Sequence, residues 1–346
     1  MQPASGGSID GFVCNIRNDG SSIIRSTYIG NANIDVIYGI KFDRSGFPYI
    51  MGTSRGAAQW PVSPGVWSNP GSKQFVMKLR PDLTGSVYST VFGTANTKPN
   101  MSPVAFLVDR CENVYISGWG GYLLPVTDPY DLAGVAGMSV TPDAIKRTTD
   151  DRDMYFIVIA KNASSLLYGS YFGQDGGDGE HVDGGTSRFD AQGVIYQAIC
   201  ANCAGGATFP TTPGVVGPIN LASPTNGCNL AAVKISFNFA GVAAGPKAFL
   251  NGVRDSVGCA PLTFEFRDTV LNAVSYEWNF GDGSPTQTTT TAQVTHLYNN
   301  VGNYRIRLIA IDSSTCNIRD TAFINVIVRA DQANLGFTRN KLPPCE

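Results

Sequence analysis

The chain has 346 residues, of which 15% are charged and 43% are hydrophobic, and its formal net charge is −2. A nearly neutral chain without a basic stripe is a poor nucleic-acid binder, because phosphate neutralisation dominates that affinity. The apolar content is too high for a disordered chain, and no apolar run approaches the roughly 18 residues of a membrane span. The 39 glycines and 20 prolines, together with the low charge, favour an all-β surface or secreted protein.

The N-terminal segment 1–7 has neither the basic region nor the apolar region of a signal peptide. Either export is not needed, or the chain is a mature piece of a longer protein.

An internal repeat of short alternating strands occupies the first two thirds of the chain. The predicted first strands are 12–16, 75–79, 155–159 and, as one extra strand, 231–235. The predicted second strands are 26–30, 89–93 and 170–173, the third 39–46, 105–110 and 186–193, and the fourth 49–52, 114–118 and 194–198. A proline-rich loop follows each fourth strand, and we expect it to lead to the first strand of the next unit.

Four short strands per repeated unit are typical of β-propeller blades. Segments 116–121 and 180–190 resemble the SBBP-type β-propeller repeats of large surface proteins from gliding bacteria with type IX secretion. The resemblance implies a partial β-propeller over 8–240, with about three four-stranded blades plus an extra strand. Because small propellers have about four blades, this number is too small to close a ring. The resemblance implies no particular ligand or reaction.

The three predicted turns between third and fourth strands begin with an aspartate at equivalent positions. These are Asp43, Asp109 and Asp190. In the first and third copies a glycine follows three residues later, as in a type I turn whose aspartate caps the backbone. Calcium binding at these turns is the alternative interpretation.

The eight cysteines favour an oxidising compartment. Cys200 and Cys203 form a C-x-x-C motif, and Cys228 follows nearby. We expect a disulfide between two of these three residues. A zinc site would need four ligands, which the surrounding sequence does not supply, and buried free thiols remain a further alternative.

A glycine-rich loop at 174–185 carries four acidic residues at short spacing. We list them as candidate calcium ligands: Asp175, Asp178, Glu180 and Asp183. Carboxylate oxygens on flexible backbone suit calcium, although the spacing departs from that of an EF-hand. A solvated loop whose acids cap turns, or a substrate-binding loop, would explain the same pattern.

A small-residue linker at 240–246 separates the repeats from a second set of alternating strands. These strands are expected at 262–266, 275–280, 304–311 and 322–328, which indicates a β-sandwich. The motif 278–283, followed by 295–298 and 301–304, resembles the polycystic kidney disease (PKD) domain, over 246–330.

The PKD resemblance implies an immunoglobulin-like β-sandwich that serves as an extracellular spacer or adhesion module. It also implies a disulfide between Cys259 and Cys316. Trp278 is expected in the core rather than at a ligand, since it occupies an inward position of a sandwich strand. His296 is expected to be packed and hydrogen-bonded rather than catalytic. Segment 335–345 echoes 248–261, so we expect 331–346 to be the start of a further, truncated domain.

The sequence contains no recognisable catalytic set. Its two histidines, His181 and His296, fall in different domains, and no nucleophile elbow, P-loop or zinc-protease motif is present. We expect a non-enzymatic adhesion or structural protein without a cofactor, at the outer-membrane surface or outside the cell. It would bind glycan or protein through propeller loops, and contact other domains of the same longer chain. The alternative is a secreted propeller hydrolase or lyase with an accessory PKD domain, in which Asp183 is the candidate carboxylate.

Overall fold

The computed structural model describes residues 2–121, 131–182, 185, 187–201, 203–204, 208–217, 227–270 and 272–330. The chain divides into two compact units, Met1–Ala240 and Gly241–Glu346, at the predicted linker. Within the described ranges the only helical segment is a short 3₁₀ turn, η1 (Lys161–Ala163). The all-β class is therefore confirmed. The further domain expected at 331–346 lies outside the described residues.

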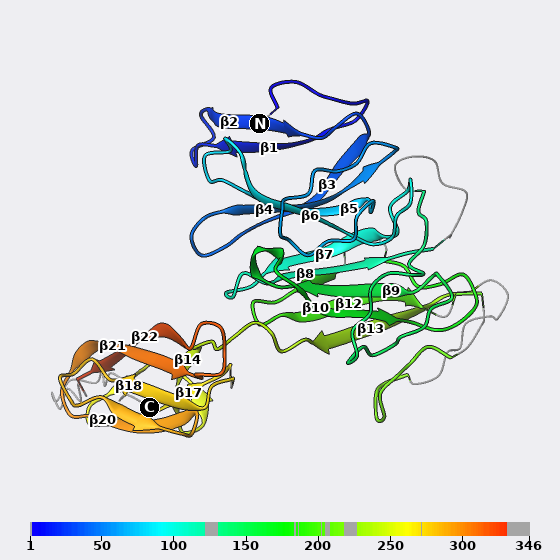
Figure 1. The fold of residues 1–346 in the computed structure, drawn as a ribbon. Helices are drawn as coiled ribbons and strands as arrows, with labels where there is room; N and C mark the ends of the chain where they lie inside the picture. Colours follow the sequence, from blue (N-terminus) through cyan, green and yellow to red (C-terminus); the bar gives the residue numbers. More distant parts are fainter. Residues whose placement is uncertain are drawn as a thin grey trace, which may run out of the picture. The chain divides into compact units, whose positions relative to one another are not determined.

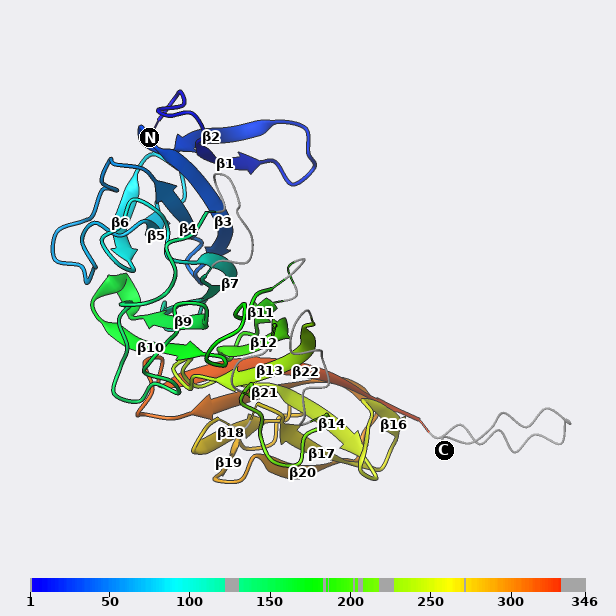
Figure 2. The ribbon, with the colours of Figure 1, turned by 90° about the vertical axis from the view of Figure 1, so that its right-hand side faces the viewer.

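Four antiparallel sheets follow one another along the N-terminal unit (Figures 1 and 2). Sheet I contains β1 (Gly11–Ile16) and β2 (Ile23–Ile29). Sheet II contains β3 (Ile34–Phe42), β4 (Pro48–Arg55), β5 (Gln74–Leu79) and β6 (Ser86–Phe92). Sheet III contains β7 (Ser102–Val108), β8 (Val114–Trp119), β9 (Met154–Ile159) and β10 (Leu166–Phe172). Sheet IV contains β11 (Ser187–Phe189), β12 (Val194–Ala201) and β13 (Asn229–Ser236).

The grouping of strands differs from the predicted units. The strands lie where the repeat places them, but β3 and β4 pair with β5 and β6 rather than with β1 and β2. The described strands form two four-stranded sheets flanked by sheets of two and three strands, not three four-stranded units plus one strand. The proline loop after β4 connects the neighbouring strands β4 and β5 of one sheet. Such a long connection is tolerated because closing a longer loop adds little entropic cost.

The central strands of sheets II and III, which are β4, β5, β8 and β9, are buried on both faces. Along β9, Tyr155, Ile157 and Ile159 pack toward sheet II, and the alternating residues Met154, Phe156 and Val158 pack toward sheet IV. This period of two explains why these strands are continuous apolar runs rather than alternating ones. The outer sheets are covered on one face only, which leaves Phe12 of sheet I 66% exposed and Leu230 of sheet IV 81% exposed.

The C-terminal unit is a sandwich of two sheets with the strand orders β15-β14-β17-β20 and β16-β22-β21-β18-β19. The first sheet contains β14 (Pro246–Leu250), β15 (Val253–Arg254), β17 (Leu262–Asp268) and β20 (Gln293–Tyr298). The second contains β16 (Val257–Cys259), β18 (Ser275–Asn279), β19 (Gln287–Thr289), β21 (Gly302–Ile311) and β22 (Arg319–Arg329). Inward positions of both sheets, including Phe264, Phe266, Trp278 and Tyr298, form one core. The core position predicted for Trp278 is confirmed.

The disulfides correct one prediction and confirm another. Cys203 bonds to Cys228, as expected for the three neighbouring cysteines. Cys259 lies opposite Arg329, at the end of β22, whereas Cys316 precedes Arg319, at its start. At about 3.3 Å per residue, these two ends are roughly 33 Å apart, while the Cα atoms of a disulfide lie within about 7 Å. The predicted pairing of Cys259 with Cys316 is therefore wrong in this register, although each of them is disulfide-bonded.

Replacing Trp278 with alanine should destabilise the C-terminal sandwich strongly. The side chain is fully buried among Phe266 and Tyr276, and emptying such a site costs about 3–5 kcal/mol. Chemical denaturation of the whole chain measures this loss. Thr288→Ala, at an exposed position of the neighbouring strand β19, is the control and should change little. A loss below about 1 kcal/mol for Trp278→Ala would contradict the core assignment.

Candidate functional site

Lys146 organises the acidic loop that the sequence singled out. Its Nζ lies 2.7 Å from Asp153 Oδ1 and 2.7 Å from Asp175 Oδ1. It also donates to the carbonyl oxygens of Gly173 and Gln174, at 3.2 and 3.1 Å. One lysine thus ties the start of the loop to the buried carboxylate of Asp153.

The second acidic position of the loop, Asp178, faces Arg152. The Arg152 Nη1 and Asp178 Oδ1 atoms are 3.8 Å apart, and Arg152 Nη1 donates to the Gly177 carbonyl at 2.6 Å. The third, Glu180, turns inward and is only 1% exposed. Its Oε1 accepts the Gln174 N–H at 2.9 Å, while its Oε2 has no hydrogen-bond partner among the described residues.

Burial changes the ionisation of Glu180. Desolvation, with the nearby carboxylate of Asp153 adding to it, raises the pKa of Glu180 to about 8. Desolvation also raises the pKa of Asp153 above its usual range, against the opposing effect of Lys146. At neutral pH Glu180 is therefore mostly protonated, which is the form that tolerates an apolar environment without a cation.

The candidate calcium ligands do not converge on one point. Asp175 faces Lys146, Asp178 faces Arg152, and Glu180 is buried. Asp183 lies outside the described residues. Over the ranges that the structure describes, no group of three or more His, Cys, Asp or Glu side chains has the arrangement of a metal site. The loop is held by its own ion pairs and backbone hydrogen bonds.

The aspartates of the repeated turns cap the backbone, as the turn interpretation predicts. In each turn, one carboxylate oxygen accepts the N–H groups two and four residues later, at 2.7–3.0 Å. The other oxygen of Asp43 binds Lys78 at 2.8 Å. That of Asp109 accepts the Tyr115 hydroxyl at 2.9 Å, and that of Asp190 accepts the Tyr196 hydroxyl at 3.3 Å.

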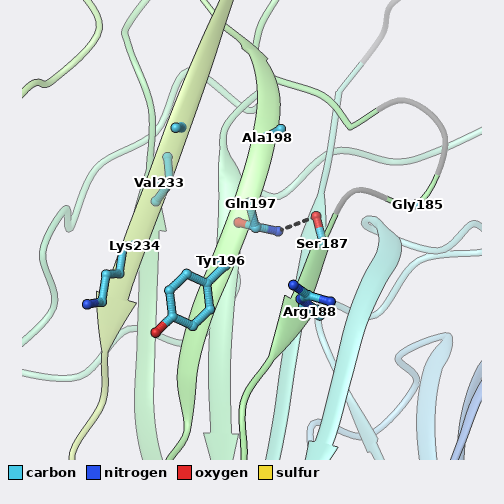
Figure 3. A pocket seen from close by; sticks show the side chains of 9 residues that line it. Gly185, Ser187, Arg188, Tyr196, Gln197, Ala198, Val233 and Lys234 are labelled. Atoms are coloured by element: carbon cyan, nitrogen blue, oxygen red, sulfur yellow. Dashed lines mark hydrogen bonds between the residues drawn. The ribbon is translucent and has the colours of Figure 1, made fainter. Parts of the chain in front are cut away.

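A hollow of about 480 Å³ lies on the outer face of sheet IV (Figure 3). Its charged and aromatic side chains are Arg188, Tyr196 and Lys234, on three neighbouring strands, whereas the buried side chain of Gln197 also donates to Ser117 of β8 at 2.8 Å. Gln197 donates to Ser187 at 3.0 Å, and the Lys234 ammonium lies 5.6 Å from the centre of the Tyr196 ring. The sequence analysis did not identify these residues as a candidate site. The signal that could have found Tyr196 is its position six residues after a turn aspartate, which Tyr49 and Tyr115 share.

His296 in the sandwich is packed and hydrogen-bonded, as predicted. Its ring stacks on Phe280, with centroids 3.8 Å apart, and its Nε2 lies 2.7 Å from Asp282 Oδ2. Although partial burial opposes it, hydrogen bonds from Ser284 and His296 lower the pKa of Asp282 to about 2. The pair ties the 281–283 turn to β20 and accounts for the spacing between the two motif segments.

Comparison with known proteins supports the assignment of the second unit. The PKD domain family matches residues 244–328, in agreement with the predicted 246–330. No curated protein sequence matches the chain. The PKD match and the disulfides point to an exported, extracellular protein. In the described part of the chain, no helix is long and apolar enough to cross a membrane.

Two solved structures from B. thetaiotaomicron are similar only at low level. The extracellular domain of BT4673, a one component system, shares 8% identity at a TM-score of 0.24, covering 94% of this chain and 54% of its own. The extracellular domain of BT3049, a hybrid two component system, shares 9% identity at a TM-score of 0.19, covering 88% of this chain and 46% of its own. The chain thus spans about half the length of these structures, and the similarity is too low to support a functional argument.

The protonated state of Glu180 should be visible in the pH dependence of stability. The folded chain keeps this proton up to about pH 8, whereas the unfolded chain releases it near 4.5. The contribution of Glu180 to the unfolding free energy is therefore full below pH 4.5 and is lost as the pH rises toward 8. Glu180→Gln should remove this loss and stabilise the chain by a few kcal/mol at pH 8 relative to the wild type.

Denaturant titrations between pH 4 and 9 measure this effect. Asp178→Asn, an exposed change in the same loop, serves as the control and should retain the wild-type slope. An unchanged slope in Glu180→Gln would show that Glu180 is ionised in the folded chain.

Calcium should not bind at the acidic loop at millimolar concentration. The carboxylates of Asp175 and Asp178 already face cationic side chains, and Glu180 holds a proton. Isothermal titration of the whole chain with calcium should therefore give no saturable heat. Saturable binding that Asp178→Ala abolishes would contradict this account and restore the calcium interpretation.

Proposed function

We propose that the chain is an exported, non-enzymatic binding module of a cell surface, in which sheets I–IV are part of a β-propeller and the PKD domain is a spacer or adhesion module. Successive antiparallel sheets packed face to face support the propeller assignment. So does the position of β7, which lies beside both β3 and β11, so that the first strands of sheets II, III and IV are neighbours. The SBBP-type resemblance adds the outer surface of a bacterium with type IX secretion as the proposed location.

The observation that carries the binding role is the rigid attachment of the long loops. Asn100, at the end of the loop between sheets II and III, is buried and uses both ends of its amide. Its Nδ2 donates to the Gly134 carbonyl at 2.7 Å and to Thr94 Oγ1 at 2.8 Å. The side-chain Oδ1 accepts the Thr94 N–H at 2.8 Å, and the backbone N–H of Asn100 donates to Gln74 Oε1 at 2.6 Å.

A similar arrangement holds the loop after β4. The buried side chain of Asn33 donates to the Ala58 carbonyl at 2.9 Å and accepts the Ala58 N–H at 3.2 Å. Loops fixed in this way bind without a large ordering cost, which favours recognition of an extended glycan or protein surface.

The placement of the acidic residues supports a non-enzymatic role. Glycoside hydrolysis requires two carboxyl groups that flank the bond to be cleaved. Asp153 and Glu180 are the carboxylates most perturbed by burial in the acidic loop region, and both are enclosed by protein. Neither can reach a polysaccharide without opening of the loop.

Array binding tests the proposal. The labelled whole chain is applied to an array of bacterial and host glycans and extracellular matrix proteins, and we expect saturable binding without turnover. Asn100→Ala should weaken that binding and lower the unfolding free energy by about 1–3 kcal/mol, because it leaves buried partners unpaired. Asn96→Ala, an exposed change in the same loop, is the matched control. Turnover of a polysaccharide or peptide substrate that Asp183→Asn abolishes would overturn the proposal in favour of a hydrolase or lyase.

A further inference from the structure

Sheets II, III and IV share a cross-strand row of three residues centred on a tyrosine. The tyrosine stands six residues after the turn aspartate, on the second strand of each sheet. In the strand register, it lies opposite one residue of the first strand and one residue of the third. The rows are Lys41–Tyr49–Lys78 in sheet II, Leu107–Tyr115–Val158 in sheet III and Arg188–Tyr196–Lys234 in sheet IV. Residues paired in this way lie on one face of an antiparallel sheet.

The row of sheet II receives an acidic side chain from sheet III. Lys78 Nζ lies 2.7 Å from Glu112 Oε2, and the Tyr49 hydroxyl donates to the same oxygen at 3.1 Å. Lys78 also lies 4.9 Å from the centre of the Tyr49 ring. Both Tyr49 and Lys78 are buried by this contact. Glu112 belongs to the turn between β7 and β8, three residues after Asp109.

The backbone at Glu112 adopts a conformation that is unfavourable for glutamate. Its φ is +64°, in the left-handed region that disfavours residues with a Cβ. The equivalent positions of the other two turns are Gly46 and Gly193, with φ of +82° and +77°. Sheet III therefore carries a strained glutamate where glycine fits better, and its carboxylate binds Lys78 and Lys161.

The row of sheet III gives the opposite case. Leu107 and Val158 replace the two cations, and the following sheet presents Gly193 at the same turn position. A Cβ at Gly193 would lie 2.9 Å from Tyr115 Cε1. The same turn position therefore covers the tyrosine of the preceding sheet at both interfaces. Over the cationic row of sheet II this position is Glu112, which supplies a carboxylate, and over the apolar row of sheet III it is Gly193, which has no side chain.

The row of sheet IV has the cationic chemistry of sheet II and is exposed. Tyr196 is 40% exposed, and Arg188 and Lys234 flank it in the hollow (Figure 3). Neither Arg188 nor Lys234 forms an ion pair with any residue that the structure describes. Tyr196 reaches the Asp190 of its own turn, as Tyr115 reaches Asp109.

We infer that the outer face of sheet IV is a docking face for another antiparallel sheet of this repeat type, whose aspartate turn carries a glutamate or aspartate at its third following residue. That carboxylate would lie between Lys234 and Tyr196, as Glu112 lies between Lys78 and Tyr49. The apolar side chains of the partner sheet would cover Leu230 and the ring of Tyr196. This inference concerns assembly and does not depend on which glycan or protein the loops bind.

A hairpin taken from the chain itself serves as the probe. Residues 102–119 comprise β7, the Asp109 turn and β8, and they present Glu112 together with Phe106, Val108, Val114 and Ile116, which pack against sheet II. The probe is this peptide, cyclised through its backbone to hold the two strands together, with Cys111→Ser and a fluorescent label. Because an isolated hairpin is marginally stable, the titration uses a peptide whose circular dichroism shows paired strands. Anisotropy titration against the whole chain should show saturable binding. A Glu112→Gln probe should bind at least ten-fold more weakly.

The same titration with protein variants locates the site. Lys234→Met keeps much of the side-chain volume, removes the cation and should weaken binding of the Glu112 probe at least ten-fold. Lys247→Met, on β14 of the PKD domain, is the control and should bind as the wild type does. The inference is overturned by absence of binding, by equal affinity for the two probes, or by full binding to Lys234→Met. If the chain binds to the glycan and protein array but does not bind the hairpin, this inference is wrong and the proposed function still holds.

Discussion

Burial of both faces of the central strands of sheets II and III is the constraint on which the N-terminal unit depends. These central strands carry apolar residues on both faces, as β9 does at every position, so neither face can be left in water. Each sheet is therefore stable only between two neighbours, and the unit grows by adding sheets rather than by enlarging one core. The same rule explains why Phe12 of sheet I and Leu230 of sheet IV are exposed, since no further described sheet of the N-terminal unit packs on these outer sheets.

Polar contacts give these sheet interfaces their specificity. Apolar side chains alone would tolerate many alignments between two packed sheets. Lys78, Tyr49 and Glu112 favour one alignment, since a slipped sheet would separate Glu112 from Lys78 and Tyr49 and leave the buried ammonium with the Asp43 carboxylate alone. Side chains also fix the loops: Asn100 joins the backbone of Thr94 to that of Gly134, and Lys146 joins the Gly173 and Gln174 carbonyls to the carboxylate of Asp153. The binding surface that we propose is a consequence of these buried attachments.

Much of this architecture could be predicted from the sequence. Period-two patterns and turn aspartates located the strands of the repeat, and the Trp278 motif located the PKD domain. The grouping of strands into sheets could not be predicted in the same way. A repeat has no intrinsic starting point, and the length of the proline loops suggested a boundary where the chain pairs neighbouring strands instead. The Cys259–Cys316 pairing failed because the parallel contact of β16 with β22 separates the two cysteines by the length of a strand.

Side-chain direction limited the prediction of the sites. The acidic residues of the glycine-rich loop look alike in the sequence, yet Glu180 is buried while Asp175 and Asp178 meet cations. Such differences depend on the loop backbone and on residues far along the chain. The row of Arg188, Tyr196 and Lys234 likewise emerges only from strand register, although the spacing of aspartate and tyrosine carries part of the signal.

Native-state hydrogen exchange tests the central claim, that two-sided burial sets the stability of each sheet. Amides of β8 and β9, which lie in a sheet covered on both faces, should exchange most slowly in the N-terminal unit. Amides of β1, β2 and β13 should exchange much faster, because their sheets are covered on one face only. Protection of β1 and β2 equal to that of β8 and β9 would contradict the account.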